Sequence, residues 1–232
     1  MIDKVETFTA LEDFSFGVST SVYHSCSVML YGEMYLFGGD DSFSNQYSRV
    51  GECGLSSTNP LPFYFNYGTC TEFYQPLSDT HGAFLCFTSA TTKNACWSFD
   101  SGYFMLEAST KFDHYESTLA TYNDGPFAIG GDNGLKVEHF SMSPPLRWAT
   151  VDPIPVSSNQ LRWFSTVTHE KVVYVFGGYE GDYQYVGDTY SYNGQWSKGA
   201  NLLRPRAGHR SVIFDDAILH IGGYNKEDEF DM

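Results

Sequence analysis

Four glycine doublets recur along the chain, and their spacing limits the fold more than any other feature of the sequence. They are Gly38-Gly39, Gly130-Gly131, Gly177-Gly178 and Gly222-Gly223, and each follows a short apolar run. The last three begin 47 and 45 residues apart, and the first gap of 92 residues is about twice that period. A strand-rich repeat of about 40 to 50 residues is typical of a β-propeller, in which each repeat is one four-stranded blade.

A fifth repeat without glycines fits into the long first gap. The apolar run 84–87 lies near its middle, and Thr88-Ser89 follows where a doublet is expected. In the clearest unit, Val172–Phe176 is expected to form the inner strand and Tyr185–Tyr192 the second. Asn193-Gly194 is a strong hairpin signal before the third strand, and His209–Phe214 is expected to be the fourth, outer strand.

The two ends of the chain are expected to complete one blade together. Three strand-like segments, Lys4–Thr9, Phe14–Val18 and Tyr23–Leu30, precede the first doublet, and no room for them remains after the last doublet. Joined to the strand Ile218–Ile221, they would remove the open edges that an arc of blades leaves. We therefore predict an all-β fold, with residues 1–232 forming a single propeller of about five four-stranded blades in a closed ring. The alternative is a truncated larger propeller.

The repeat resembles the kelch motif, an apolar strand ending in Gly-Gly with an aromatic residue in the next strand and a tryptophan in the third. Gly177-Gly178, Tyr190 and Trp196 carry this pattern, Trp148 is the tryptophan of the preceding unit, and His209 ends an Arg-x-x-His sequence. His24 stands in the same place ahead of Gly38. Phe104, in contrast, stands where tryptophan is usual, and five blades are fewer than the usual six or seven. The resemblance implies a kelch-type propeller that acts as a non-enzymatic scaffold or adaptor in protein–protein contacts.

The composition is that of a folded, acidic protein. Apolar residues make up 42% of the chain, and 28 acidic against 13 basic residues give a net charge of −15. This charge argues against nucleic-acid backbones and anionic membranes as partners. No apolar stretch approaches the length of a membrane span, and the N-terminus lacks a signal-peptide core, which favours the cytoplasm.

The cysteines point the other way, because all five lie in the first 96 residues. Cys86 and Cys96 fall on predicted neighbouring antiparallel strands, where a disulfide can form. Cys53 with Cys70 is a second expected pair, which leaves Cys26 as a small buried apolar residue. If these bonds form, the missing signal peptide indicates an incomplete gene model or a fragment of a larger secreted kelch protein, so the localisation stays open.

No catalytic residue, cofactor site or metal site is expected. The seven histidines show no metal-ligand spacing, and no nucleophile-elbow or Cys-x-x-Cys sequence is present. The doublets are expected to serve packing, since glycine tolerates conformations and contacts that a Cβ forbids.

The loops after the doublets are expected to gather on one face of the ring as a candidate binding surface for a protein or a basic peptide. Its residues are Asp40, Asp41, Asp132, Tyr179, Glu180, Asp182, Tyr183 and Tyr224. Loops are polar in any soluble protein, which is the simpler explanation of the acidic groups. The alternative function is a carbohydrate-binding or galactose-oxidase-like propeller that uses its central channel.

Overall fold

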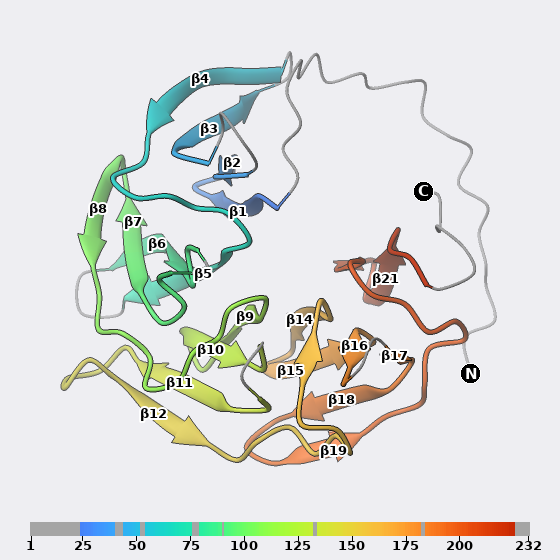
Figure 1. The fold of residues 1–232 in the computed structure, drawn as a ribbon. Helices are drawn as coiled ribbons and strands as arrows, with labels where there is room; N and C mark the ends of the chain where they lie inside the picture. The colour runs from blue at the N-terminus through green and yellow to red at the C-terminus, as the bar shows by residue number, and fades with distance from the viewer. Residues whose placement is uncertain are drawn as a thin grey trace.

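The computed structural model describes residues 24–39, 44–51, 54–75, 79–89, 91–131, 134–181 and 184–225. All the regular structure in this part of the chain is β-strand. Four antiparallel sheets of four strands and one sheet of two strands stand around a common centre (Figure 1). This arrangement confirms the all-β propeller class.

The five sheets follow one another along the chain. The first contains β1 (Cys26–Leu30), β2 (Glu33–Phe37), β3 (Gln46–Gly51) and β4 (Gly54–Pro60). The second contains β5 (Thr69–Gln75), β6 (Thr80–Cys86), β7 (Cys96–Asp100) and β8 (Tyr103–Leu106). The third contains β9 (Thr118–Tyr122), β10 (Gly125–Ile129), β11 (Val137–Ser141) and β12 (Arg147–Val151).

The remaining strands form the fourth sheet, the fifth sheet and a small additional sheet. The fourth contains β14 (Ser165–His169), β15 (Val172–Phe176), β18 (Thr189–Tyr192) and β19 (Trp196–Lys198). The fifth contains β20 (Arg210–Phe214) and β21 (Ala217–Ile221). The small sheet contains β13 (Leu161–Arg162), β16 (Tyr179–Glu180) and β17 (Gln184–Tyr185), with β16 in the middle.

We call the strand that ends at a glycine doublet, or at the equivalent position, the doublet strand. It is the second strand of its sheet and not the innermost, so the predicted blade boundaries are wrong by one strand. β1, β5, β9 and β14 lie nearest the centre in Figure 1. β20, expected as an outer fourth strand, instead pairs with the doublet strand β21, with Arg210 opposite Ile221. A tight turn at Asp215-Asp216, with φ of 49° and 58°, joins these two strands directly. Two positive φ values in a two-residue turn match the twist of a hairpin.

One of the three N-terminal strands expected in the closing blade belongs to another sheet. The segment expected at Tyr23–Leu30 contributes β1, which pairs with β2 inside the first sheet. The strand expected at Ile218–Ile221 lies in β21 and pairs with β20. The other two expected strands, Lys4–Thr9 and Phe14–Val18, lie outside the described residues.

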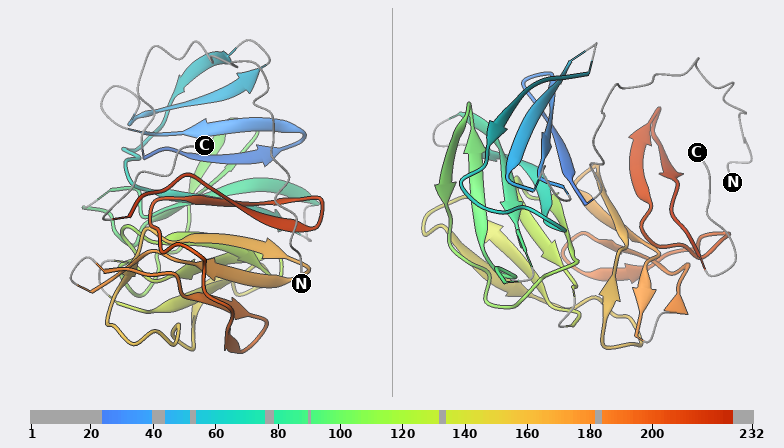
Figure 2. Two further views of the ribbon diagram at one scale, coloured as in Figure 1. Left: turned by 90° about the vertical axis from the view of Figure 1, so that its right-hand side faces the viewer. Right: turned by 45° about the horizontal axis from the view of Figure 1, so that its top comes forward.

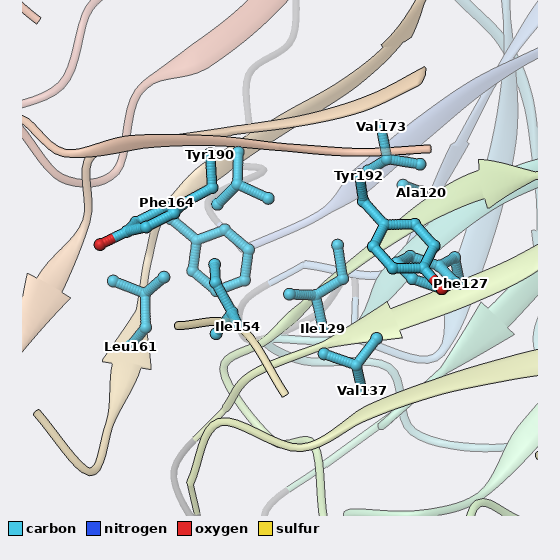
Figure 3. Close-up of a cluster of buried hydrophobic side chains, with 11 residues drawn as sticks. Ala120, Phe127, Ile129, Val137, Ile154, Leu161, Phe164, Val173, Tyr190 and Tyr192 are labelled. Atoms are coloured by element: carbon cyan, nitrogen blue, oxygen red, sulfur yellow. The ribbon is translucent and has the colours of Figure 1, made fainter. Parts of the chain in front are cut away.

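Apolar clusters fill the spaces between neighbouring sheets, which stand face to face in the views of Figure 2. One cluster lies between the first and second sheets and includes Phe37 and Phe99. Another lies between the second and third and includes Phe84 and Phe140. The third and fourth sheets share the cluster of Figure 3, where Phe127 stacks on Tyr192 with ring centroids 4.9 Å apart. The core is therefore divided among the sheet-to-sheet contacts.

The glycine doublets lie at close contacts between neighbouring sheets. Gly177 has a φ of +60°, and a Cβ there would lie 2.6 Å from the carbonyl oxygen of Arg206 in the segment that enters the fifth sheet. The next amide, of Gly178, donates to that same oxygen at 2.8 Å. Gly39 donates to Phe65 of the second sheet's entry segment at 3.0 Å. Only glycine allows this approach without a shift of the neighbouring backbone.

In the second sheet, the doublet position is filled by Phe87-Thr88 and not by the expected Thr88-Ser89. The Phe87 amide donates to the carbonyl of Ala95 at 2.8 Å, as Gly177 does to Asp188 at 2.9 Å. Phe87 also has a φ of +58°, like the first glycine of each doublet. The prediction was wrong by one residue because Phe87 reads as part of the apolar strand, and phenylalanine gives no signal for a left-handed conformation.

Candidate binding site

Five equivalent residues precede the first strands of the five sheets, and all five have a left-handed backbone. In each sheet, the last residue of the doublet strand pairs with a residue of the first strand, and the equivalent residue lies two positions before that partner. We call this set the mouth ring: His24, Tyr67, Glu116, Trp163 and Gly208, with φ of 60°, 61°, 59°, 52° and 67°. Only one of them is glycine, although this conformation costs an ordinary residue about 1 kcal/mol. Backbone strain of this kind gathers at functional sites.

All five residues of the mouth ring line one central pocket of about 770 Å³, which we call the mouth pocket. All five sheets contribute to its wall with the beginnings of their innermost strands. Its lining combines the mouth ring with Tyr224, Arg210 and a set of hydroxyl side chains. The hydroxyl residues are Ser25, Ser27, Thr69, Ser117, Thr118, Ser165, Thr166 and Ser211. A concave site with aromatic and hydrogen-bonding groups from five segments is suited to ligand binding.

Aromatic rings pair at two places in the lining of the mouth pocket. The rings of His24 and Tyr67 are stacked with centroids 3.6 Å apart, although they come from the entries to the first and second sheets. Trp163 lies 6.2 Å from Tyr224, measured between ring centroids. Two sides of the mouth pocket are therefore lined by flat apolar faces with polar edges.

One carboxylate of the mouth ring is held by an arginine. Glu116 accepts a hydrogen bond from Nη1 of Arg162 at 3.1 Å, and both side chains are largely buried. Arg162 lies on β13, where it pairs with Tyr179 of β16. The small sheet thus fixes the cation that neutralises Glu116.

Three tyrosines form a cluster beside the mouth pocket. Tyr179 donates a hydrogen bond from its hydroxyl to the hydroxyl of Tyr185, and Tyr224 lies 6.3 Å from Tyr179 between ring centroids. Burial and the nearby Tyr185 hydroxyl raise the pKa of Tyr179. Burial, then the charges of Tyr185 and Glu116, raise the pKa of Tyr224 to about 12. The phenols of Tyr179 and Tyr224 are therefore neutral hydrogen-bonding groups near pH 7.

Three members of the predicted binding face lie in the described part of the chain. Tyr179 is buried, Glu180 is half-buried, and Tyr224 reaches the mouth pocket. Burial, followed by the charge of Asp188, raises the pKa of Glu180. The other members, Asp40, Asp41, Asp132, Asp182 and Tyr183, lie outside the described residues. The structure brings Tyr179 and Tyr224 together.

The two tryptophans of the expected motif lie on the outermost strands, and each donates a hydrogen bond to the preceding sheet. Trp148 Nε1 donates to the carbonyl of Ala108 at 2.8 Å, and Trp196 Nε1 donates to that of Asp152 at 2.8 Å. Each acceptor follows the last strand of the sheet before it. Phe104 cannot donate such a bond and packs on Phe99, with centroids 4.8 Å apart.

Tyr190 and His209 are buried members of the expected motif. The Tyr190 hydroxyl donates to Oδ2 of Asp188 at 3.1 Å. Burial, with the nearby His220 and Arg206, lowers the pKa of His209 to about 3, so this imidazole is neutral. His24 is the counterpart of Gly208 and not of His209, which corrects the predicted equivalence: His24 is exposed in the mouth ring, whereas His209 is buried.

Two disulfides are present among the described residues. Cys86 and Cys96, the expected pair, face each other on β6 and β7 with Cα atoms 4.1 Å apart. Cys70 is joined to Cys26, so the expected Cys53–Cys70 pair is wrong, as is the expectation that Cys26 is unpaired. β1 and β5 belong to different sheets, and sequence spacing does not reveal that they lie side by side. Cys53 lies outside the described residues.

A buried hydrogen bond between His114 and Glu138 supports the segment that carries Glu116. His114 Nε2 lies 3.1 Å from Oε2 of Glu138, and its Nδ1 lies 2.7 Å from the carbonyl of Gly130. Burial acts to raise the pKa of Glu138, but bonds from His114 and from the amides of Lys111 and Phe112 outweigh it and lower the pKa. His114 comes two residues before Glu116, so this pair anchors the entry to the third sheet.

The described residues contain no cluster of three or more His, Cys, Asp or Glu side chains that could hold a metal ion. Nor does this part of the chain form any helix able to cross a membrane. Sequence reasoning missed the mouth ring entirely. Its members share a backbone conformation and a position before the first strand, but no residue type.

Comparison with known proteins supports the propeller architecture. Residues 164–203, which span the fourth sheet, match the family model of the Kelch motif. The solved structure of YjhT is similar over 89% of this chain and 78% of that one, with a TM-score of 0.71 and 15% identity. No curated protein matches the chain. The matched motif lies in the sheet that carries Gly177-Gly178, Tyr190 and Trp196, and sheets of the same strand order recur around the centre, so the chain has a β-propeller fold with a kelch repeat at residues 164–203.

Proposed function

We propose that the chain is a non-enzymatic protein-interaction module that binds a partner at the face carrying the mouth ring. The observation that carries this proposal is the mouth ring itself, in which four of five left-handed positions hold large functional side chains. Kelch repeats generally mediate protein binding, and aromatic residues dominate the energetics of protein interfaces. A protruding loop of the partner would place a side chain in the mouth pocket and contact the surrounding segments.

A basic partner fits the charge of the protein. The net charge of −15 steers cationic surfaces toward the molecule and repels anionic ones. The arginine on Glu116 and the pocket-lining Arg210 restrict this attraction to the area outside the mouth pocket. We therefore assign the pocket to aromatic and hydrogen-bonding contacts, and the attraction of basic groups to the rest of the acidic surface.

Partner capture with matched variants tests the proposal. Trp163→Ala and Tyr67→Ala each remove an aromatic side chain from the mouth ring. Tyr103→Ala is the control: this tyrosine is 82% exposed and lies where β7 ends and β8 begins, at the end of these strands away from Cys86 and Cys96. Proteins captured from the source tissue by the wild type should be lost from both mouth-ring variants and retained by the Tyr103 variant. Binding of such a partner should weaken as salt is raised, because exposed charges are screened. Retention by Trp163→Ala would contradict the proposed site.

Saccharide binding in the mouth pocket is the second candidate function. The hydroxyl side chains on the wall favour it, because they can exchange hydrogen bonds with a polyhydroxylated ligand while Trp163 and Tyr67 cover its apolar faces. A glycan array distinguishes the two candidates. Binding of a defined glycan by the wild type and by Tyr103→Ala, but not by Trp163→Ala, would favour the saccharide.

A further inference from the structure

We propose that the Cys26–Cys70 disulfide is a site of thiol–disulfide exchange with an external dithiol, and that its reduction loosens the His24–Tyr67 side of the mouth ring. The exchange stands on the geometry of the two disulfides alone. Any change in partner binding that follows from the loosened mouth ring rests on the proposed function.

The Cys26–Cys70 bond faces the mouth pocket. Both cysteines belong to the pocket lining, and Cys70 is only partly buried. Cys26 is 9% exposed. The pocket gives a small thiol an approach to the bond from the central opening, and access is one of the factors that set the rate of exchange.

The Cys86–Cys96 bond lies in a different environment. Both residues are 0% exposed and belong to the apolar cluster between the second and third sheets, with Phe84 and Phe140. They are also cross-strand partners in one hydrogen-bonded pair of strands, β6 and β7. An incoming thiolate would have to enter a packed apolar core to reach either sulfur.

The two bonds also constrain different parts of the fold. Cys86–Cys96 closes 10 residues within a hairpin that its hydrogen bonds already hold together. Cys26–Cys70 spans 44 residues and joins the innermost strands of two separate sheets. Breaking it removes the covalent tie between the first and second sheets at the pocket.

The affected side of the pocket carries two members of the mouth ring. His24 precedes Cys26 by two residues, Tyr67 precedes Cys70 by three, and their rings stack at 3.6 Å. Both residues hold a left-handed backbone that ordinary side chains disfavour. Without the disulfide, the contacts between the two entry segments must hold this strained pair together.

The exchange takes two steps. A thiolate of the dithiol attacks Sγ of Cys70, the less buried of the two residues, to form a mixed disulfide, and Sγ of Cys26 leaves as a thiolate. The second thiol of the dithiol then attacks the sulfur atom of the dithiol in the mixed disulfide, and Sγ of Cys70 leaves as a thiolate. Two electrons and two protons pass from the dithiol to the protein, leaving two cysteine thiols and a cyclic disulfide.

Differential alkylation of the native protein tests the site. The folded chain is treated with increasing dithiothreitol, trapped with one alkylating reagent, then denatured, fully reduced and treated with a second reagent of different mass. Peptide mass spectrometry reads each cysteine separately, so Cys53 does not interfere. Cys26 and Cys70 should acquire the first label at a rate about tenfold higher than Cys86 and Cys96. Simultaneous labelling, the reverse order, or labelling of all four only on unfolding would overturn the proposal.

Hydrogen exchange tests the consequence. After selective reduction and alkylation, amides in segments 24–25 and 66–68 should exchange faster, whereas those of β15 in the fourth sheet should be unchanged. The Cys26→Ser/Cys70→Ser variant should reproduce this pattern, and the alkylated wild type serves if that variant does not fold. Unchanged exchange at both segments would overturn the coupling to the mouth ring. The labelling order does not depend on any partner, so failure of the proposed function is seen separately, as capture that ignores Trp163 and Tyr67.

Discussion

The second and fourth sheets share one backbone arrangement, but different side-chain interactions stabilise it. In the fourth, the position after the doublet strand is Gly177; in the second it is Phe87, and the two φ values are 60° and 58°. Trp196 donates a hydrogen bond at the outer edge of the fourth sheet, whereas Phe104 packs among aromatic rings. The second sheet also carries the Cys86–Cys96 bond immediately before Phe87.

This difference shows that the repeat is defined by geometry, which more than one set of residues can satisfy. Phe87 is 0% exposed and lies 5.1 Å from His114 between ring centroids, so burial offsets part of the cost of its left-handed backbone. A disulfide next to it restricts the unfolded chain. The fourth sheet achieves the same turn through glycine alone.

The largest effect is expected from breaking the glycine turn of the fourth sheet. In Gly177→Ala the new Cβ would lie 2.6 Å from the Arg206 carbonyl oxygen, so backbone must move. We expect a loss of about 3 kcal/mol in the free energy of unfolding, from overpacking together with left-handed strain. Gly181→Ala is the matched control, because Gly181 also has a positive φ but no atom within 4 Å of a new Cβ. Urea denaturation that gives equal losses for both would refute the role of close approach.

A slightly smaller effect is expected from removing the disulfide of the second sheet. The Cys86→Ser/Cys96→Ser variant should lose up to about 3 kcal/mol under oxidising conditions, because the unfolded chain regains the freedom of the closed loop. Guanidinium denaturation, with the Cys26–Cys70 disulfide kept intact, measures this loss of stability. A denaturation midpoint equal to that of the wild type would show that Phe87 does not need this support.

A loss of about 1 kcal/mol is expected when the outer-edge bond of the fourth sheet is removed. Trp196→Phe keeps a ring but loses the 2.8 Å bond to Asp152, which makes the fourth sheet resemble the second at Phe104. Trp148→Phe removes the corresponding bond to Ala108 and should behave alike. If thermal unfolding shows no shift for either variant, these bonds do not distinguish the sheets.

The smallest effect concerns pH. Asp188 of the fourth sheet stands where the second has Ala95, and it accepts hydrogen bonds from Lys198 at 2.7 Å and from Tyr190. Burial acts to raise the Asp188 pKa, but these two bonds, together with the charge of Lys198 and a hydrogen bond from Asn201, outweigh it and hold the pKa below its ordinary 3.8. A lowered folded-state pKa contributes stability above the unfolded-state pKa, and this is lost as pH falls through the folded value.

We therefore expect Asp188→Asn to cost under about 1 kcal/mol near pH 7. The difference from the wild type should shrink as the pH falls below about 4, where the unfolded chain becomes protonated at this carboxylate, and should be lost once the pH is below the folded-state pKa. Urea denaturation at a series of pH values checks this. A difference that stays constant from pH 7 to pH 3 would show that the charge of Asp188 does not contribute.

Several features of the fold were predictable because they depend on local backbone properties. Strand alternation marks β15 and β21, glycine marks the left-handed turns at Gly130 and Gly177, and the doublet period marks the repeat. The blade boundary was not predictable in this way. Apolar runs before and after a turn look alike, so the hydrogen-bonded pairing of β20 with β21 decides which strand is innermost.

The candidate site was largely hidden from the sequence. Tyr179 and Tyr224 could be found because each follows a doublet, whereas Tyr67 and Trp163 sit in irregular segments without a shared residue type. The Cys26–Cys70 bond joins strands that are 44 residues apart and not hydrogen-bonded to each other. Neither hydrophobic period nor turn chemistry contains information on that contact.

The sequence by itself determined the repeat, the strand-rich class and the positions where glycine is required, because period and turn conformation are properties of neighbouring residues. Only the tertiary structure decided that His24, Tyr67, Glu116 and Trp163 meet around one pocket, that Cys70 bonds Cys26, and that Phe87 can take the place of a glycine. These outcomes depend on how successive sheets are placed around the centre, where packing between distant segments sets which side chains meet and which strain is tolerated.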